Sequence, residues 1–259
     1  MPRVLVIVPF PMDEPNLALR RDQIAAVRWG SDIDFEFRPV IAGPTNYSSH
    51  HDFVLADISI LSAGLKAQQE GFDAVCIDTM SDSGMAALRS VLEIPVFGPG
   101  RASMLVALML GDRFSIITMT SRWKPLYKKT LDELGIHHKC ASIRAIEVPP
   151  DNQGLLSGKE EEVFPLLADA SRKAIEVDGA DVLVLGSTTM HQSHSYLCSH
   201  LPVPIINPGP LSYKLAETAL ALGLAHSRKA YPRPAHPKLE MIEAMLATAQ
   251  ECERTKKAQ

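Results

Sequence analysis

The segments ADVLVLGST (residues 180–188) and FDAVCIDTM (residues 72–80) are two copies of one pattern, and most of the expected fold follows from them. Each copy is an apolar run that starts near an aspartate and ends at a hydroxyl residue. Asp73 matches Asp181, and Thr79 matches Ser187, at the same offset along the chain. The pattern therefore predicts an internal duplication.

Further segments repeat in the same order around these copies. The segment IPVFGPG (94–100) matches VPIINPG (203–209), and the strand-like run at 4–10 has a partner at 114–119. The apolar runs alternate with helical patterns, which is typical of parallel sheets covered by helices on both faces. We expect an α/β protein of two pseudo-symmetric lobes, each with a four-stranded parallel sheet.

The repeat also sets the expected domain boundaries. Residues 1–98 and 208–259 are predicted to form lobe 1, and residues 99–207 lobe 2. A proline-rich connector at 230–237 leads to a terminal helix in lobe 1. Periodicity in lobe 1 predicts strands at 3–8, 34–40 and 72–77, and helices at 17–29, 52–69 and 238–253.

The composition excludes several classes of partner. The 259 residues carry a net charge of −4, so no basic field is present to attract nucleic acid or an anionic membrane. The four cysteines are scattered without zinc-site or disulfide spacing, and we expect no metal. The first residues lack the pattern of a signal peptide, so we expect a cytoplasmic protein.

The matched hydroxyl residues indicate where a ligand would bind. Thr79 and Ser187 each follow a strand, and ligands of open parallel sheets bind beyond the carboxyl ends of the strands. If the two halves face each other, both hydroxyls reach one cleft between them, a common place for a small-molecule site. No Gly-x-Gly-x-x-Gly turn follows a strand and no Walker loop occurs, so no nucleotide cofactor is indicated.

Four segments resemble motifs of a known family: the first strand at 4–9, GPTNY at 43–47, TMSDSG at 79–84 and LGSTTM at 185–190. Over about residues 3–225 the chain resembles the aspartate/glutamate/hydantoin racemase superfamily, and most closely its hydantoin and allantoin racemase branch. The resemblance implies two flavodoxin-like lobes with a cofactor-free site between them. We also expect a homo-oligomer that acts on a small molecule.

The chain departs from this family at the positions that carry the chemistry. The family's racemases place one cysteine on each side of the substrate, and these positions match Thr79 and Ser187. A cysteine thiolate can act as a base, whereas an aliphatic hydroxyl needs a strong neighbouring base. Cys76 lies three residues before Thr79 and is expected to be a core residue. The two-thiol mechanism is therefore not available in that form.

Hydroxyl residues at the two turns are the main candidates for ligand binding. Thr79, Ser81, Ser187, Thr188 and Thr189 can donate hydrogen bonds to a carboxylate or imide oxygen, together with N–H groups of the turns. The same donors would stabilise an enolate-like charge. The alternative is that these side chains cap the helices that follow.

Two residues beside these turns are candidates for proton transfer. Asp78 precedes Thr79 and is interpreted as a base, as the partner of a neighbouring hydroxyl, or as a buried hydrogen-bond acceptor. His191 follows Ser187 by four residues and is a candidate general acid or base near neutral pH, or an ordinary residue at a helix start.

Residues at the end of the strand near 114–119 are predicted to reach the same site. The family's matching turn contributes substrate contacts, so Thr118 and Thr120 are predicted donors. Arg122 is either the partner of an anion or solvated. Tyr127 is either a core residue or part of the pocket wall.

Other residues are predicted to shape the wall of the site. Pro9 and Phe10 stand where the family has a polar turn, which removes an amide and adds an aromatic ring. Tyr47 occupies a position where a branched aliphatic residue is usual, and Met80 adjoins Thr79. These changes indicate a substrate that is bulkier or flatter than a small amino acid.

The favoured function is therefore a cofactor-independent isomerase or racemase that moves a proton on a small carboxylate or cyclic ureide. One alternative is a decarboxylase or other lyase that uses the same hydroxyl pocket. A second is a hydrolase with Ser187 or Thr79 as nucleophile and His191 as base. A third is a ligand-binding protein without catalytic activity.

Overall fold

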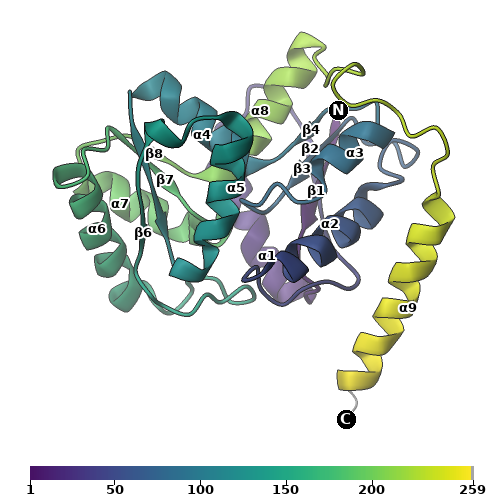
Figure 1. The fold of residues 1–259 in the computed structure, drawn as a ribbon, viewed down its shortest axis with the longest axis horizontal. Coiled ribbons are helices and arrows are strands. Elements are labelled where there is room, and N and C mark those ends of the chain that lie inside the picture. Colours follow the sequence, from purple (N-terminus) through teal and green to yellow (C-terminus); the bar gives the residue numbers. More distant parts are fainter. Residues whose placement is uncertain (258–259) are drawn as a thin grey trace.

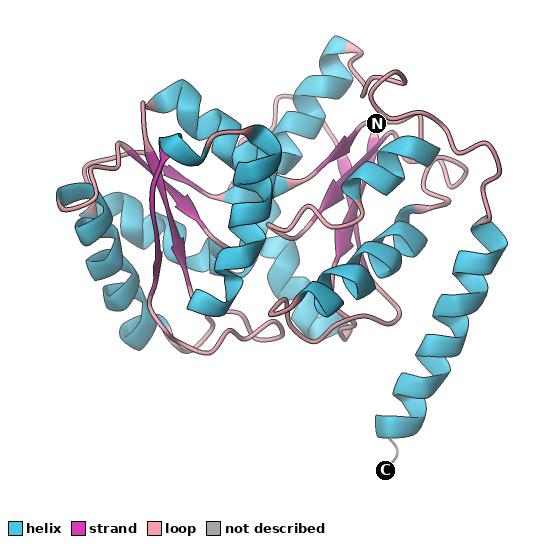
Figure 2. Ribbon diagram, in the orientation of Figure 1, coloured by secondary structure: helices cyan, strands magenta, loops and turns pink. Residues whose placement is uncertain are grey.

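Two lobes lie side by side, each built on a parallel sheet with helices on both faces (Figure 1, Figure 2). The computed structural model describes residues 1–257 of the protein, with side chains described up to Arg254. Each sheet has four strands, in the orders β2-β1-β3-β4 and β6-β5-β7-β8. The predicted fold class is confirmed, and the two strand orders are the same in both halves of the repeat.

The first half of the chain contributes the first sheet. Its elements are β1 (Arg3–Val8), α1 (Glu14–Arg21), the 3₁₀ helix η1 (Asp22–Ile24), β2 (Asp34–Pro39), α2 (His50–Gly64), β3 (Ala74–Ile77), α3 (Met85–Val91) and β4 (Val96–Phe97).

The second half contributes the second sheet and the helices that follow it. Its elements are α4 (Pro99–Leu110), β5 (Phe114–Thr118), η2 (Ser121–Trp123), α5 (Lys124–Leu134), η3 (His137–Lys139), β6 (Cys140–Ala145), α6 (Glu160–Glu176), β7 (Val182–Leu185), η4 (Thr188–Ser193), α7 (His194–His200), β8 (Ile205–Ile206), α8 (Pro208–Leu222) and α9 (Leu239–Lys257).

Two helices cross from one lobe to the other. α4 follows the last strand of the first sheet but packs on β5 and β7 of the second sheet. α8 follows the last strand of the second sheet but packs on β3 and β4 of the first. The two helices also pack against each other, so the exchange joins the lobes.

The duplicated aspartates have the same structural role in both lobes. Asp73 accepts a hydrogen bond from the N–H of Arg3, at the start of β1, at 2.8 Å. Asp181 accepts from the N–H groups of Asp112 and Arg113, just before β5, at 3.1 and 3.0 Å. Each carboxylate thus fixes the start of the central strand of its own sheet.

The helix after the first strand differs from the predicted 17–29. α1 begins earlier, at Glu14, because Asp13 caps it by accepting from the N–H of Asn16 at 3.1 Å, and Pro15 fits its first turn. It ends at Arg21 and continues as the 3₁₀ helix η1. Arg20, near the end of this helix, contacts Asn152 and Thr188 of the second lobe.

The helix predicted at 52–69 and the terminal helix also differ in their ends. α2 begins at His50 because Ser49 and Asp52 form a capping box, and it ends at Gly64. α9 runs to Lys257 on the outer side of the first lobe, beside α2 (Figure 1). Leu246 of α9 is buried, whereas Met241 and Met245 are about half exposed.

Candidate functional site

The turns after β3 and β7 have the same local geometry. Thr79 accepts from the N–H of Ser81 at 3.4 Å, and its hydroxyl lies 3.3 Å from the Ser81 hydroxyl. Ser187 accepts from the N–H of Thr189 at 3.2 Å, and its hydroxyl lies 2.8 Å from that of Thr189. The repeat therefore extends to the hydroxyl pairs. The side chains that cap the two turns are the same ones that are candidates for binding a ligand.

Thr79 and Ser187 line one cavity between the lobes, as the repeat predicts. The cavity has a volume of about 20 Å³, which is room for about one water molecule. We call it the inter-lobe cavity, and its walls are Phe10, Arg20, Tyr47, Asp78, Thr79, Met80, Trp123, Leu126, Asn152, Gly186, Ser187, Thr188 and Thr189.

A wider cleft adjoins the inter-lobe cavity and shares Phe10 and Asn152 with it. This outer cleft has a volume of about 820 Å³, and its other walls are Pro11, Gly43, Pro44, Thr45, Pro149, Pro150, Asp151, Gln153, Lys159 and Glu253. Glu253 comes from α9 and accepts a hydrogen bond from the N–H of Gly43 at 3.2 Å. The terminal helix therefore contributes to the approach to the cavity.

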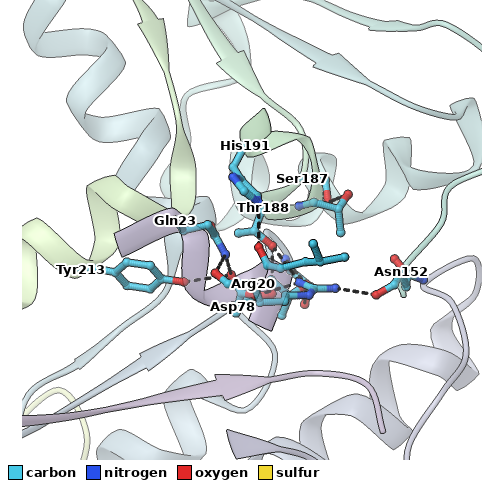
Figure 3. Close-up of polar contacts among 12 residues, drawn as sticks. Arg20, Gln23, Asp78, Asn152, Ser187, Thr188, His191 and Tyr213 are labelled. Atoms are coloured by element: carbon cyan, nitrogen blue, oxygen red, sulfur yellow. Dashed lines mark hydrogen bonds and ion pairs between the residues drawn. The ribbon is translucent and has the colours of Figure 1, made fainter. Parts of the chain in front are cut away.

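Asp78 is the centre of a buried polar cluster on one side of the cavity (Figure 3). Its Oδ2 accepts from Arg20 Nη1 at 2.7 Å, and both side chains are fully buried. Its Oδ1 accepts from Gln23 Nε2 at 3.3 Å and from the Tyr213 hydroxyl at 3.2 Å. Of the three interpretations of Asp78, the contacts fit the buried acceptor, since three donors already hold its carboxylate.

The Arg20 guanidinium ties this cluster to the second lobe. Nη2 donates to the carbonyl oxygen of Asn152 at 3.1 Å, and Nη1 lies 3.4 Å from the Thr188 hydroxyl. The Thr188 hydroxyl in turn donates to the carbonyl oxygen of Asp78 at 3.1 Å. Thr188 thus joins the two strand-end turns directly.

His191 lies beside this cluster but is not among the residues that line the cavity (Figure 3). Its Nε2 is 3.2 Å from the carbonyl oxygen of Leu19, on α1. Burial lowers the pKa of His191 below its usual value, although the negative charge of Asp78 acts to raise it. The ring is therefore neutral at neutral pH, donates to the main chain of α1, and has no contact with either turn hydroxyl.

Cys76 is placed as expected, in the core. Its side chain is fully buried, and burial raises the pKa of its thiol far above the ordinary range. Its sulfur lies 3.7 Å from the carbonyl oxygen of Ser212, away from the cavity. It does not replace a catalytic thiol.

The residues after β5 support the site from behind. The Thr118 and Tyr127 hydroxyls are 2.7 Å apart, and Tyr127 donates to the carbonyl oxygen of Gly186, next to Ser187, at 2.7 Å. Thr120 caps η2 by accepting from the N–H of Arg122, whose side chain is exposed. None of these four predicted site residues lines the cavity. Tyr127 is a buried core residue and not part of the pocket wall.

Some of the remaining residues predicted to form the wall line the cavity, and others are buried next to it. Phe10 and Tyr47 line the cavity and meet edge to face, with ring centroids 5.5 Å apart, and Met80 also lines it. Pro9 and Ser81 are buried close by but do not line it. The aromatic wall is thus present on the side of the first lobe.

Four residues of this cluster were not predicted from the sequence: Arg20, Gln23, Asn152 and Tyr213. A signal for Arg20 exists, because it lies in the helix that follows the central strand of the sheet and is the last but one residue of that helix. The other three carry no local pattern that distinguishes them from solvated residues, and they join the site only through contacts distant in the sequence.

Neither a metal site nor a membrane segment is found in the part of the chain that the structure describes. Within residues 1–257, no three His, Cys, Asp or Glu side chains are grouped in a way that suits a metal ion. No described helix is both long and apolar enough to cross a bilayer.

Comparison with known proteins identifies the family. The family model described as Asp/Glu/Hydantoin racemase matches residues 22–216. The chain is 30% identical to the hydantoin racemase of Pseudomonas sp. (strain NS671) over 206 residues, which cover 78% of this chain and 80% of that one. It is 30% identical to the hydantoin racemase of Rhizobium meliloti over 207 residues, 73% of this chain and 79% of that one.

The fold agrees with a solved structure from the same family. The allantoin racemase from Klebsiella pneumoniae superposes with a TM-score of 0.81 at 27% identity, over 92% of this chain and 95% of that chain. The likeness covers 92% of this chain and therefore includes both lobes and their flavodoxin-like architecture. By fold, family model and sequence identity, the chain belongs to the Asp/Glu/hydantoin racemase family and is an isomerase of the racemase type.

Proposed function

We propose that this racemase-type enzyme removes and returns a proton at a carbon atom of a small cyclic ureide or carboxylate held between Thr79 and Ser187, without a cofactor. The observation that supports this best is the convergence of the two hydroxyls, from equivalent turns, on one cavity. A base and an acid on opposite faces of a carbon atom are what inversion requires. The names of the relatives support a ureide as the substrate.

The hydroxyls act in this proposal as relays. The bond from carbon to hydrogen breaks, its electron pair moves toward the adjacent carbonyl, and the proton passes to a hydroxyl oxygen that releases its own proton in turn. Ser187 is bonded to Thr189, and Thr79 to Ser81, so each hydroxyl has a neighbour for that exchange. The released proton passes along its own chain of hydroxyls to water outside the cavity, and a proton from water returns through the other hydroxyl. Asp78 lines the cavity, but Arg20, Gln23 and Tyr213 already hold its carboxylate, so we assign it to fix the position of Arg20 and not to take the proton.

Substrate binding requires the lobes to move apart. The inter-lobe cavity of about 20 Å³ is smaller than a ureide ring, whereas the adjoining outer cleft is about 820 Å³. We assign the outer cleft as the entry route and an enlarged inter-lobe cavity, closed around the substrate, as the reacting state. Closure removes water from the reacting atoms and strengthens the hydrogen bonds to them.

Two finer features belong to the same proposal. The enzyme is a homo-oligomer, which fits the large apolar side chains exposed on α4 and α8, such as Met109 at 81% and Leu222 at 66%. It works in the cytoplasm, which fits the four cysteines, none of which forms a disulfide.

The hydrolase and lyase alternatives have no specific observation in their favour. A hydrolase needs a base within reach of Ser187 or Thr79, but the hydrogen-bond partners of these hydroxyls are other hydroxyls and turn N–H groups. His191 is bonded to α1 instead.

The test is solvent deuterium incorporation at the ring carbon of a 5-substituted hydantoin, followed by proton NMR. We expect the wild type to exchange this proton, and Thr79→Ala and Ser187→Ala each to lower the rate by about 10²-fold, as loss of a proton-transfer group does. Thr218→Ala is the control, since its exposed hydroxyl on α8 contacts only the Lys214 carbonyl oxygen. Full rates in both site variants would contradict the proposal, and release of CO₂ from a malonate would indicate a decarboxylase.

A further inference from the structure

Two buried polar atoms on the wall of the inter-lobe cavity have no hydrogen-bond partner. They are Nε of Arg20 and the hydroxyl oxygen of Tyr47. Arg20 is fully buried and Tyr47 is 3% exposed. Burying a polar group without a partner is costly, so such groups need an explanation where they occur. The other partnerless buried atoms among the described side chains lie on residues outside this wall.

Arg20 is held through its two Nη atoms, and its Nε–H group has no hydrogen-bond partner. Nη1 donates to Asp78 and Nη2 to the carbonyl oxygen of Asn152, at 2.7 and 3.1 Å. The guanidinium carbon also lies 6.0 Å from the centre of the Phe10 ring. These contacts fix the plane of the group and leave Nε–H as a donor on a rigid support.

The Tyr47 hydroxyl is also a donor. Burial raises the pKa of Tyr47 well above its usual value, so the phenol stays protonated at neutral pH. The Thr79 and Ser81 hydroxyls are its near neighbours, but no hydrogen bond of normal geometry joins them to it. The phenol therefore lies beside the hydroxyl at which proton transfer is assigned.

The charge of the cluster bears on the kind of ligand that would satisfy these donors. Arg20 is paired with Asp78, so the pair is neutral before a ligand binds. A carboxylate ligand would add a buried charge without a counter-ion, which is unfavourable. A neutral ureide carbonyl adds no charge at first and gains negative charge on its oxygen only as the proton leaves.

We propose that Arg20 Nε–H and the Tyr47 hydroxyl together bind the carbonyl oxygen of a cyclic ureide and stabilise its negative charge in the transition state. The inference rests on the proposed function and extends it to the substrate class. As the carbon–hydrogen bond breaks, its pair forms a carbon–carbon double bond, and the carbonyl π pair moves to the oxygen between the two donors. The pair returns to carbon when the proton is delivered from the other face.

Tyr47→Phe tests this assignment with a minimal change. It removes one oxygen that has no partner, so we expect the melting temperature to be unchanged or raised. The maximal rate of deuterium exchange on a 5-substituted hydantoin is expected to fall by about 10²-fold, the usual effect of losing one such donor, with KM changed much less. Tyr231→Phe is the matched control, because its hydroxyl binds Arg89 Nη1 at 2.9 Å, far from the cavity wall.

Arg20→Lys provides a second readout. It keeps the positive charge opposite Asp78 but has no planar edge with Nε–H, so we expect a similar loss of rate at a similar KM. A panel of ureides and amino acids tests the substrate class, with turnover of ureides expected. An amino acid exchanged faster than any ureide would overturn the assignment of the substrate.

The outcomes separate this inference from the proposal beneath it. If the wild type exchanges the hydantoin proton and Tyr47→Phe does so at the full rate, the donor pair is wrong while the proposed function stands. If the wild type exchanges no proton on any member of the panel, the proposed function fails, and the donor pair fails with it.

Discussion

At the scale of single residues, the candidate site is built on two side chains with matched local geometry. Thr79 and Ser187 each accept an N–H from the residue two positions later and each contact a second hydroxyl. Because their own turns hold the two oxygens, a change of atom at these positions need not move the backbone. The pair can therefore be converted to thiols to test its place in the reaction.

Thr79→Cys combined with Ser187→Cys is expected to raise the rate of hydantoin proton exchange by about tenfold or more, because a thiol ionises near neutral pH and a hydroxyl does not. Exchange measured by NMR in the double variant, in each single variant and in Ser199→Cys, an exposed position, checks the prediction. A folded double variant that gains nothing would mean that these positions do not face the reacting carbon.

Sequence patterns predicted the two hydroxyl positions but not the residues that surround them. Thr79 and Ser187 could be found because a duplication repeats them after equivalent strands. Arg20 could not be found in this way, since its partners Asp78 and Asn152 lie 58 and 132 positions away and the second lobe does not repeat it. His191 was placed near the site in sequence, yet its ring binds α1.

The start of α4 shows how one element is fixed by a turn of the site. Asp82 follows the Thr79 turn in a left-handed conformation, φ 51°, and accepts from the N–H groups of Gly100 and Arg101 at 2.8 and 2.6 Å. A Cβ at Gly98 or Gly100 would lie 2.3 Å from the nearest atom. Gly98 is therefore needed for close packing on the Asp82 side chain, and Gly100 for close packing on the carbonyl oxygen of Met80.

Asp82 is expected to make the stability of the protein depend on pH. Burial raises the pKa of Asp82 from 3.8 to about 6, although the hydrogen bonds from the N–H groups of Gly100 and Arg101 act to lower it. Between these values the folded state binds more protons than the unfolded state, so the free energy of unfolding falls as pH rises. The loss is complete above about pH 6 and is at most about 3 kcal/mol.

Asp82→Asn removes this titration, so urea unfolding at pH 4 and pH 7 checks the prediction. The wild type should lose more stability than the variant between these two pH values, since the other titrating groups are shared. An equal pH dependence in both proteins would contradict the assigned role of Asp82.

In the molecule as a whole, hydrogen bonds join the two lobes beside the inter-lobe cavity. Trp123 donates to the Asn46 side chain at 2.8 Å, and the Asn152 side chain donates to the carbonyl oxygen of Thr45 at 3.1 Å. Both contacts surround the cavity and join residues 77 or more positions apart. The repeat predicted two lobes with facing strand ends, but such contacts between the lobes leave no pattern in the sequence.

We propose that one substrate molecule is held between the two matched hydroxyls. A crystal structure of the protein soaked with a 5-substituted hydantoin tests this proposal. We predict density for the ring between the Thr79 and Ser187 hydroxyls, in an inter-lobe cavity enlarged from its present size of about 20 Å³. A ring bound elsewhere, with neither hydroxyl within hydrogen-bond distance of it, would contradict the claim.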